Sequence, residues 1–394
     1  MTHRERILTA LRHQPADRVP LDLGGTGSST ISFLAHQRLR AHLNLPCAPP
    51  PVMYSQRSGT VIPDDAILER FGIDTRPVKL AKPQIAPEQE VDADTFIDEW
   101  GVTWHRVPEG HFLSVDGPFY RLTDPVPGDL KRLNWPDRND HADYRRVQDW
   151  ARRLHEETDC ALILNLPNGP VHQSQYLRGY RQWLEDLLIH PDFVAALAER
   201  ITDVWVGIAT LALEATRNYV DLLCYGDDLA MQQAPLMRLE LYRELIKPHH
   251  KRMAATVNKF GKPILFHSCG SVSSLIPDLL DVGIDALNPV QVAAANMDTR
   301  RLKQEFGRDL TFWGGIDTQH VLPLGTPGEV RDEVRRRIDD LGDGGGYVLC
   351  PVHNVQPEVP PENLVAMFDA ALEFRPCVFP KVSSRIARSN IDSV

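Results

Sequence analysis

The chain has 394 residues and a formal net charge of −10, with 42% apolar and 24% charged residues. This composition is typical of a globular protein with a large core, and the acidic excess argues against a general nucleic-acid or anionic-membrane surface, which needs clustered Lys and Arg. A charged start without a following apolar segment and six scattered cysteines predict a reduced, cytoplasmic protein without a secretory signal or membrane span.

Helical and strand patterns alternate along most of the chain. A helix over Thr2–Arg12 precedes an apolar strand over Val19–Leu23, and a helix over Asp64–Phe71 precedes a strand over Ile73–Val78. From about residue 160, six more strands alternate with helices: Ala161–Leu166, Val220–Tyr225, Pro263–His267, Ile284–Pro289, Leu310–Gly314 and Tyr347–Cys350. Strands that are apolar on both faces and alternate with helices favour parallel pairing, and eight of them close a barrel. The sequence therefore predicts a single-domain (β/α)8 TIM barrel over residues 1–394.

The stretch from about residue 80 to 145 does not follow this alternation. It contains several prolines and alternating polar and apolar positions around Asp98–Trp104. Such a pattern predicts an inserted β-hairpin with a loop that lies over one end of the barrel. The tail beyond Pro380 is expected to be irregular.

Three residues at predicted strand ends could hold a metal ion. His267 and Cys269 are two positions apart, so they face the same side of an extended chain, and Cys350 ends the last strand. The carboxyl ends of all barrel strands open on one face, so these side chains are expected to meet there. One nitrogen and two sulfur atoms suit zinc and leave a coordination position open for substrate. Taken alone, each of these residues would more often be a buried core residue. Two thiolates favour activation of a thiol over activation of water, which makes a zinc hydrolase the weaker interpretation.

Other polar residues follow the strand ends, where barrels collect their active-site groups. Asp227 and His353 are predicted to act in catalysis. The predicted substrate-binding residues are Asp22, Asp228, Asp317, Gln356 and Tyr176, with Asn354, Asn165 and His172 as further candidates. Helix or turn capping is the alternative role for the aspartates.

Six short segments form a recognisable set of motifs: Arg4–Arg6, Arg18–Pro20, Gly226–Asp228, His267–Gly270, Gly314–Asp317 and Cys350–Pro357. Together they resemble the uroporphyrinogen decarboxylase superfamily, which includes zinc-dependent methylcobamide methyltransferases. The resemblance implies a barrel with its site at the strand carboxyl ends. It also places His267, Cys269 and Cys350 at the positions of the zinc ligands in enzymes that pass a methyl group between a corrinoid and a thiol. The decarboxylases carry an arginine-rich motif after the first strand, whereas Pro20–Gly25 contains no arginine, so a porphyrin substrate is disfavoured.

The leading hypothesis is a zinc-dependent methyltransferase or demethylase that acts on a small-molecule methyl donor or acceptor. The chain contains no Asp-x-His-x-x-Gly corrinoid motif, so a corrinoid would come on a separate protein, which could dock on the Asp98–Tyr120 insertion. The alternatives are a metal-independent decarboxylase or lyase of a small acid, with Asp22 or Asp227 and His353 as acid-base groups, and a non-catalytic partner of a corrinoid protein. The sequence does not identify the methyl donor or the methyl acceptor. It also leaves open whether the insertion mediates formation of a homodimer.

Overall fold

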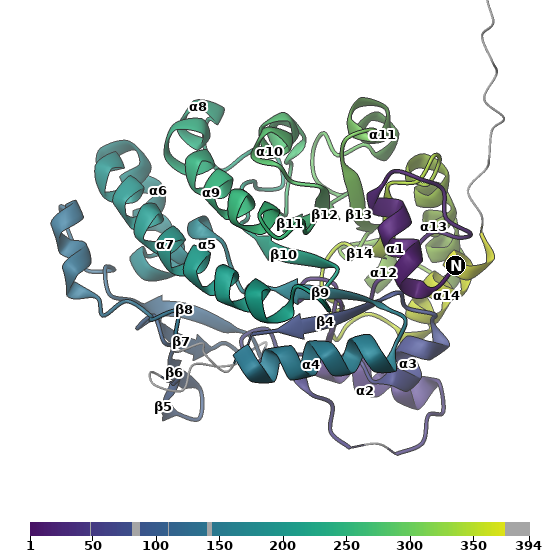
Figure 1. The fold of residues 1–394 in the computed structure, drawn as a ribbon. Helices are drawn as coiled ribbons and strands as arrows, with labels where there is room; N and C mark the ends of the chain where they lie inside the picture. Colours follow the sequence, from purple (N-terminus) through teal and green to yellow (C-terminus); the bar gives the residue numbers. More distant parts are fainter. Residues whose placement is uncertain (48, 81–86, 109, 140–143, 375–394) are drawn as a thin grey trace, which may run out of the picture.

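The computed structural model describes residues 1–47, 49–80, 87–108, 110–139 and 144–374, and its centre is a curled sheet of seven parallel strands (Figure 1). The strands, in the spatial order β14-β13-β12-β11-β10-β9-β4, are β4 (Thr75–Lys79), β9 (Ala161–Asn165), β10 (Leu222–Gly226), β11 (Ile264–His267), β12 (Ala286–Val290), β13 (Thr311–Ile316) and β14 (Tyr347–Pro351). Each lies within a few residues of its predicted position. The predicted α/β barrel architecture is confirmed.

The segment from Pro20 to Leu23 occupies the eighth position, between β14 and β4. Two backbone hydrogen bonds with Leu349, of 2.9 and 3.0 Å, join it to β14, and the Asp74 N–H joins it to the start of β4. Gly24, with a φ of +86°, then turns the chain away from the sheet. The first predicted strand is therefore present as a single parallel bridge that completes the ring.

Helices surround the strands on the outside of the ring (Figure 1). They are α1 (His3–Leu11), α2 (Phe33–His42), α3 (Asp65–Arg70), α4 (Tyr144–Glu157), α5 (Pro170–Arg178), α6 (Tyr180–Ile189), α7 (Pro191–Thr216), α8 (Leu239–Leu241), α9 (Lys247–Asn258), α10 (Ile276–Val282), α11 (Thr299–Phe306), α12 (Val321–Leu324), α13 (Pro327–Leu341) and α14 (Pro361–Glu373). Side-chain caps begin several of them. Thr2 with Glu5, and Thr326 with Glu329, form reciprocal capping boxes. The long helix predicted over Met237–Phe260 is interrupted by a π-turn, Tyr242–Ile246, ahead of Pro248.

No helix among the described residues is long and apolar enough to cross a bilayer.

The insertion is larger than the predicted hairpin. It forms a four-stranded antiparallel sheet of β5 (Gln89–Asp92), β6 (Thr95–Ile97), β7 (Thr103–Arg106) and β8 (Phe112–Asp116), followed by a 3-10 turn over Pro127–Arg132. A second small sheet contains β1 (Ile31–Ser32), β2 (Met53–Ser55) and β3 (Thr60–Val61). The tail that the sequence predicts to be irregular lies outside the described residues.

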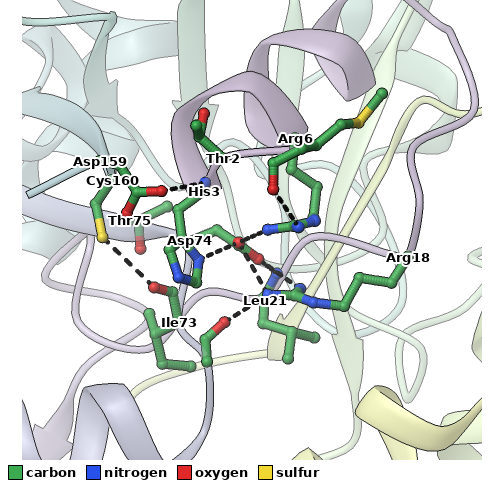
Figure 2. Close-up of polar contacts among 12 residues, drawn as sticks. Thr2, His3, Arg6, Arg18, Leu21, Ile73, Asp74, Thr75, Asp159 and Cys160 are labelled. Carbon is green, nitrogen blue, oxygen red and sulfur yellow. Dashed lines mark hydrogen bonds and ion pairs between the residues drawn. The ribbon is translucent and has the colours of Figure 1, made fainter.

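An ion-pair network around Asp74 fixes the amino-terminal segment at the opposite end of the barrel from the strand carboxyl ends (Figure 2). The Asp74 carboxylate is fully buried and accepts hydrogen bonds from Arg6 (2.6 Å) and from Arg18 (2.7 and 3.0 Å). The Leu21 N–H also donates to it, at 2.7 Å. One carboxylate therefore joins α1, the closing segment Pro20–Leu23 and the start of β4.

Replacing Asp74 with Ala is expected to lower the free energy of unfolding by about 3–5 kcal/mol, because the mostly buried Arg18 guanidinium would lose its counter-charge and Arg6 would keep only its pair with Asp17. Urea unfolding monitored by circular dichroism would measure the loss. Asp369→Ala is the control, since Asp369 forms a partly exposed pair with Arg70 and should cost less than about 1 kcal/mol. Equal losses in the two variants would contradict this role of Asp74.

Candidate functional site

The parallel register places the candidate site residues side by side at the strand carboxyl ends. Gly226 at the end of β10 pairs with His267 at the end of β11, and His267 pairs with Asn288 of β12. Because each strand of a barrel ends at the same face, residues that follow these positions also collect there.

Asn288 fixes the orientation of the His267 imidazole. The Asn288 Nδ2 group donates to the Trp313 carbonyl at 3.4 Å, so the amide oxygen is the atom that faces His267. The His267 Nδ1–H then donates to Asn288 Oδ1 at 2.7 Å. The lone pair is left on Nε2, and this arrangement is typical of histidine ligands of metals.

His267, Cys269 and His353 form a group that could hold a metal ion. Their ligand atoms lie within 4.8 Å of one another. The His267 Nε2 and Cys269 Sγ atoms are 3.5 Å apart. Zn–N and Zn–S bonds of about 2.0 and 2.3 Å in tetrahedral geometry would place such atoms about 3.5 Å apart. Without an ion, the same distance corresponds to a thiol–imidazole hydrogen bond.

The pKa shifts of this group follow from burial. Burial lowers the pKa of His267 to about 4, against the opposing charge of Asp228, so its imidazole is neutral at pH 7. Burial also lowers the pKa of His353. Burial and the nearby Asp228 raise the pKa of Cys269, so its thiolate needs a cation beside it.

Cys350, the third ligand predicted from the sequence, lies outside this group. Its side chain is fully buried among the apolar residues of the barrel interior. The thiol donates to the Pro351 carbonyl at 3.2 Å, and Asn288 Nδ2 lies 3.8 Å from the sulfur.

Asp227 and Asp228 occupy different environments although they are adjacent. Asp227 is fully buried, and its carboxylate accepts the backbone N–H groups of Val171 (2.9 Å) and His172 (2.7 Å) at the start of α5. The Nε2 atom of His250, on α9, lies 3.0 Å from the same carboxylate. Asp227 therefore holds the amino end of α5, the capping role that the sequence left open for these aspartates.

Asp228 is the carboxylate that faces the metal-binding group. Its Oδ1 atom accepts the Cys269 N–H at 2.8 Å and lies 3.7 Å from His267 Nε2. Its Oδ2 atom lies 3.4 Å from His172 Nε2. Burial alone would lower the pKa of His172, but the charges of Asp228 and Asp227 outweigh it and raise the pKa to about 9. The raised pKa favours the imidazolium form of His172 beside Asp228 at neutral pH, whereas the Asp228 N–H, 3.2 Å from His172 Nε2, would donate to the neutral ring.

The inserted sheet reaches the site through Trp104 of β7. The Trp104 and Tyr176 rings pack edge to face, with 4.9 Å between their centroids, and the Tyr176 ring stacks on that of His172. The Arg57 guanidinium lies 4.0 Å above Trp104. Asp98 accepts hydrogen bonds from both Arg57 and Trp104, at 2.8 Å each. Tyr176 thus connects the insertion, through Trp104, to His172 and its partner Asp228.

Asp22 lies inside the barrel rather than at its mouth. It is fully buried and accepts hydrogen bonds from Gly25 N–H, Thr75 Oγ1 and Trp313 Nε1, at 2.6–2.9 Å. Burial raises the pKa of this carboxyl group.

The remaining predicted residues have local partners. The Asp317 carboxylate accepts the N–H groups of Gln319 and His320 and lies 3.0 Å from the His320 ring. Gln356 donates to the side chain of Asn354. The structure therefore brings Asp228 and Tyr176 close to the metal-binding group and shows turn contacts for Asp317 and Gln356.

The sequence did not identify Asn288 and Ser28, which contact His267, or His250, which contacts the supporting Asp227. Asn288 stands at the end of a predicted strand, which was a usable signal, because polar residues at that position of a barrel often serve the site. Ser28, whose Oγ lies 3.5 Å from His267 Nε2, and His250 carried no comparable signal.

Comparison with known proteins assigns the family. Residues 71–374 match the family described as uroporphyrinogen decarboxylase (URO-D). The chain belongs to this family. The resemblance seen in the sequence is thereby confirmed.

Relatives within the URO-D family differ in their described activities. A methylated-thiol--coenzyme M methyltransferase of Methanosarcina mazei is 26% identical over 257 residues, which cover 64% of this chain and 65% of that protein, just under two thirds of its length. A uroporphyrinogen decarboxylase of Alkalilimnicola ehrlichii is 21% identical over 380 residues, 94% of each chain. A solved structure described as a methyltransferase from Methanosarcina mazei has a TM-score of 0.64 at 19% identity and covers 95% of this chain and 99% of that chain, which shows a shared fold.

In chelator-treated protein, the His172 imidazole is expected to titrate near pH 9, and Asp228→Asn is expected to lower its pKa markedly. The unfolded pKa is about 6.5, so the stabilisation from this pair is complete below that pH and is lost as the pH rises through about 9. An NMR titration of the histidine rings would measure both values. Asp317→Asn, remote from His172, should leave its pKa unchanged; a His172 that titrates near 6.5 in the wild type would contradict the pairing.

Proposed function

We propose that this protein is a zinc-dependent methyltransferase or demethylase that moves a methyl group between a small substrate or thiol and a corrinoid protein. The observation that carries the proposal is the pairing of His267 Nε2, with its free lone pair, and the Cys269 thiol at 3.5 Å. The methyltransferase relative from Methanosarcina mazei supports the same class of reaction.

His267 and Cys269 fit a zinc ion in their atom types and separation, and the sequence predicts Cys350 as the third ligand. A bound zinc ion would lower the pKa of a coordinated substrate thiol and keep it as the more nucleophilic thiolate.

The chain's own residues would orient the reacting groups. Asn288 holds the imidazole of His267 so that Nε2 points at the site, and Asp228 holds the backbone of Cys269. In its protonated form, His172 would balance the charge of Asp228, so that this carboxylate would not repel an anionic substrate. Since the chain carries no corrinoid motif, the corrinoid would arrive on a separate protein, and the insertion around Trp104 is the proposed contact at the mouth.

The charge of the mouth argues against a tetrapyrrole that carries many carboxylates. The loop that follows the closing segment, residues 24–30, contains no Arg or Lys and contacts the site through Ser28. A site that binds a ligand with several carboxylates needs guanidinium or ammonium groups as donors.

A second candidate is a metal-independent decarboxylase or lyase that acts on a small, non-porphyrin acid. The alignment of the Alkalilimnicola decarboxylase over 94% of this chain favours it. Asp22, with its raised pKa, and His353 would be the acid-base groups. The full burial of Asp22 by donors of the chain itself weighs against this candidate.

Replacing Asn288 with Ala is expected to weaken zinc affinity by about 10- to 100-fold, because the ring of His267 would lose its orienting acceptor. His267→Ala and Cys269→Ser should lose zinc and methyl transfer together. Chelator competition would measure affinity, and transfer from methylcobalamin to a panel of thiols would measure activity. Cys224→Ser, which alters a buried thiol away from this group, is the control. Wild-type zinc affinity in Cys269→Ser would contradict the proposed site.

Removal of zinc separates the two candidate functions. Methyl transfer is expected to disappear in chelated protein and to return when zinc is added back. Carbon dioxide release from small carboxylic acids, followed with labelled substrates, should be absent in both forms. Release that persists in chelated protein and is lost in Asp22→Asn would instead support the decarboxylase.

A further inference from the structure

Both peptide groups that flank Cys269 are held by side chains of other loops. The Cys269 N–H donates to Asp228 Oδ1 at 2.8 Å. The next peptide group carries the Gly270 N–H, which donates to Gln291 Oε1 at 2.6 Å in a buried hydrogen bond. Because a peptide group is planar, fixing the group on each side of Cys269 fixes its φ and ψ and so sets the direction of its Cα–Cβ bond.

The orientation of the buried Gln291 amide is itself determined by hydrogen bonds. Its oxygen accepts the Gly270 N–H, so its nitrogen is the atom that donates to Gln232 Oε1, at 2.8 Å. The Gln232 nitrogen then donates to the Ala293 carbonyl at 2.8 Å and to Gln319 Oε1 at 3.2 Å. A backbone N–H at one end and a backbone carbonyl at the other therefore decide how both amides are turned, and hydrogen bonds aligned in one direction strengthen one another.

The two glutamines join the loops on both sides of the loop after β11. Gln232 follows β10 and Gln291 follows β12, and β11 lies between those strands in the sheet. The loop after β11 also contacts one neighbour directly, because the Ser271 N–H donates to the Met231 carbonyl at 2.9 Å. Gly270 has a φ of +94°, and a Cβ atom there would lie 2.7 Å from the Met231 carbonyl oxygen, so this close approach requires glycine. The loop is thus held from both sides.

We propose that Gln291 is a positioning residue for the Cys269 thiol, and that Gln232 acts by holding the Gln291 amide. These two side chains are called the amide clasp below. The proposal rests on the proposed metal-dependent function, in which Cys269 is a ligand. A ligand on a loop loses chain entropy when an ion binds, and a loop that is already fixed loses less. The amide clasp would therefore raise metal affinity without supplying a ligand.

Hydrogen exchange in chelator-treated protein tests the amide clasp without metal and without activity. Gln291→Met keeps the size of the side chain and removes the acceptor, so the amides of residues 269–271 are expected to exchange about 10-fold faster, as for loss of one hydrogen bond. Gln291→Glu keeps an acceptor for the Gly270 N–H and should restore most of the protection. Asn363→Leu is the matched control, because the buried Asn363 amide donates to two backbone carbonyls at α12 and should not affect residues 269–271.

Zinc affinity tests whether the amide clasp acts on the ligand. Gln291→Met is expected to weaken zinc binding about 10-fold, as for loss of a contact that orients a ligand, whereas Gln291→Glu should stay close to the wild type. Gln232→Met should have a smaller effect, and none when Gln291→Met is already present, because Gln232 acts through Gln291. Chelator competition would measure affinity, and circular dichroism would show that each variant is folded.

The outcomes separate this proposal from the metal-dependent function. Unchanged exchange at residues 269–271 in Gln291→Met, or equal acceleration in Asn363→Leu, would overturn the proposal. Wild-type zinc affinity in Gln291→Met would also overturn it, while the metal-dependent function stands. Additive losses in the double variant would overturn the role of Gln232. If the wild type binds no zinc but exchange follows the expected pattern, the metal-dependent function fails and the positioning of Cys269 stands.

Discussion

The candidate site depends on the hydrogen bond between His267 and Asn288. Parallel pairing of β11 with β12 sets these residues side by side, and the Trp313 carbonyl determines which end of the amide faces the ring. The imidazole thus has one tautomer, with its lone pair directed at Cys269. Without this contact the ring could rotate, and neither a metal ion nor a substrate would meet a fixed nitrogen atom.

The adjacent residues Asp227 and Asp228 have different structural roles, one at a helix and one at the site. Asp227 is turned away from the mouth and holds the start of α5 with its buried carboxylate. That helix carries His172, which returns to pair with Asp228. The position of Asp228 beside Cys269 is therefore supported twice, by its own strand end and by a helix that its neighbour fixes.

The two ends of the barrel use charge differently. At the amino end, Asp74 meets two arginines and is saturated with hydrogen bonds, which joins α1 to the closing segment (Figure 2). At the carboxyl end, the Asp228 carboxylate is partly exposed, and its oxygens lie 3.4 Å from His172 Nε2 and 3.7 Å from His267 Nε2. This separation of a stabilising end from a reactive end is the usual organisation of TIM barrels.

The sequence by itself determined the strands, their parallel order and the residues that follow their ends. Strands that are apolar on both faces and alternate with helices are compatible with few folds other than a parallel α/β sheet or barrel. It therefore predicted that His267, Cys269 and Cys350 meet at the strand carboxyl ends, with Asp228 as a further candidate after a neighbouring strand. It could not determine which side chains contact the His267 imidazole, since those contacts join strands that are far apart in the chain. Only the tertiary structure placed the Asn288 amide against both His267 and Cys350. It also brought the ligand atom of His353, on the loop after β14, within 4.8 Å of those of His267 and Cys269.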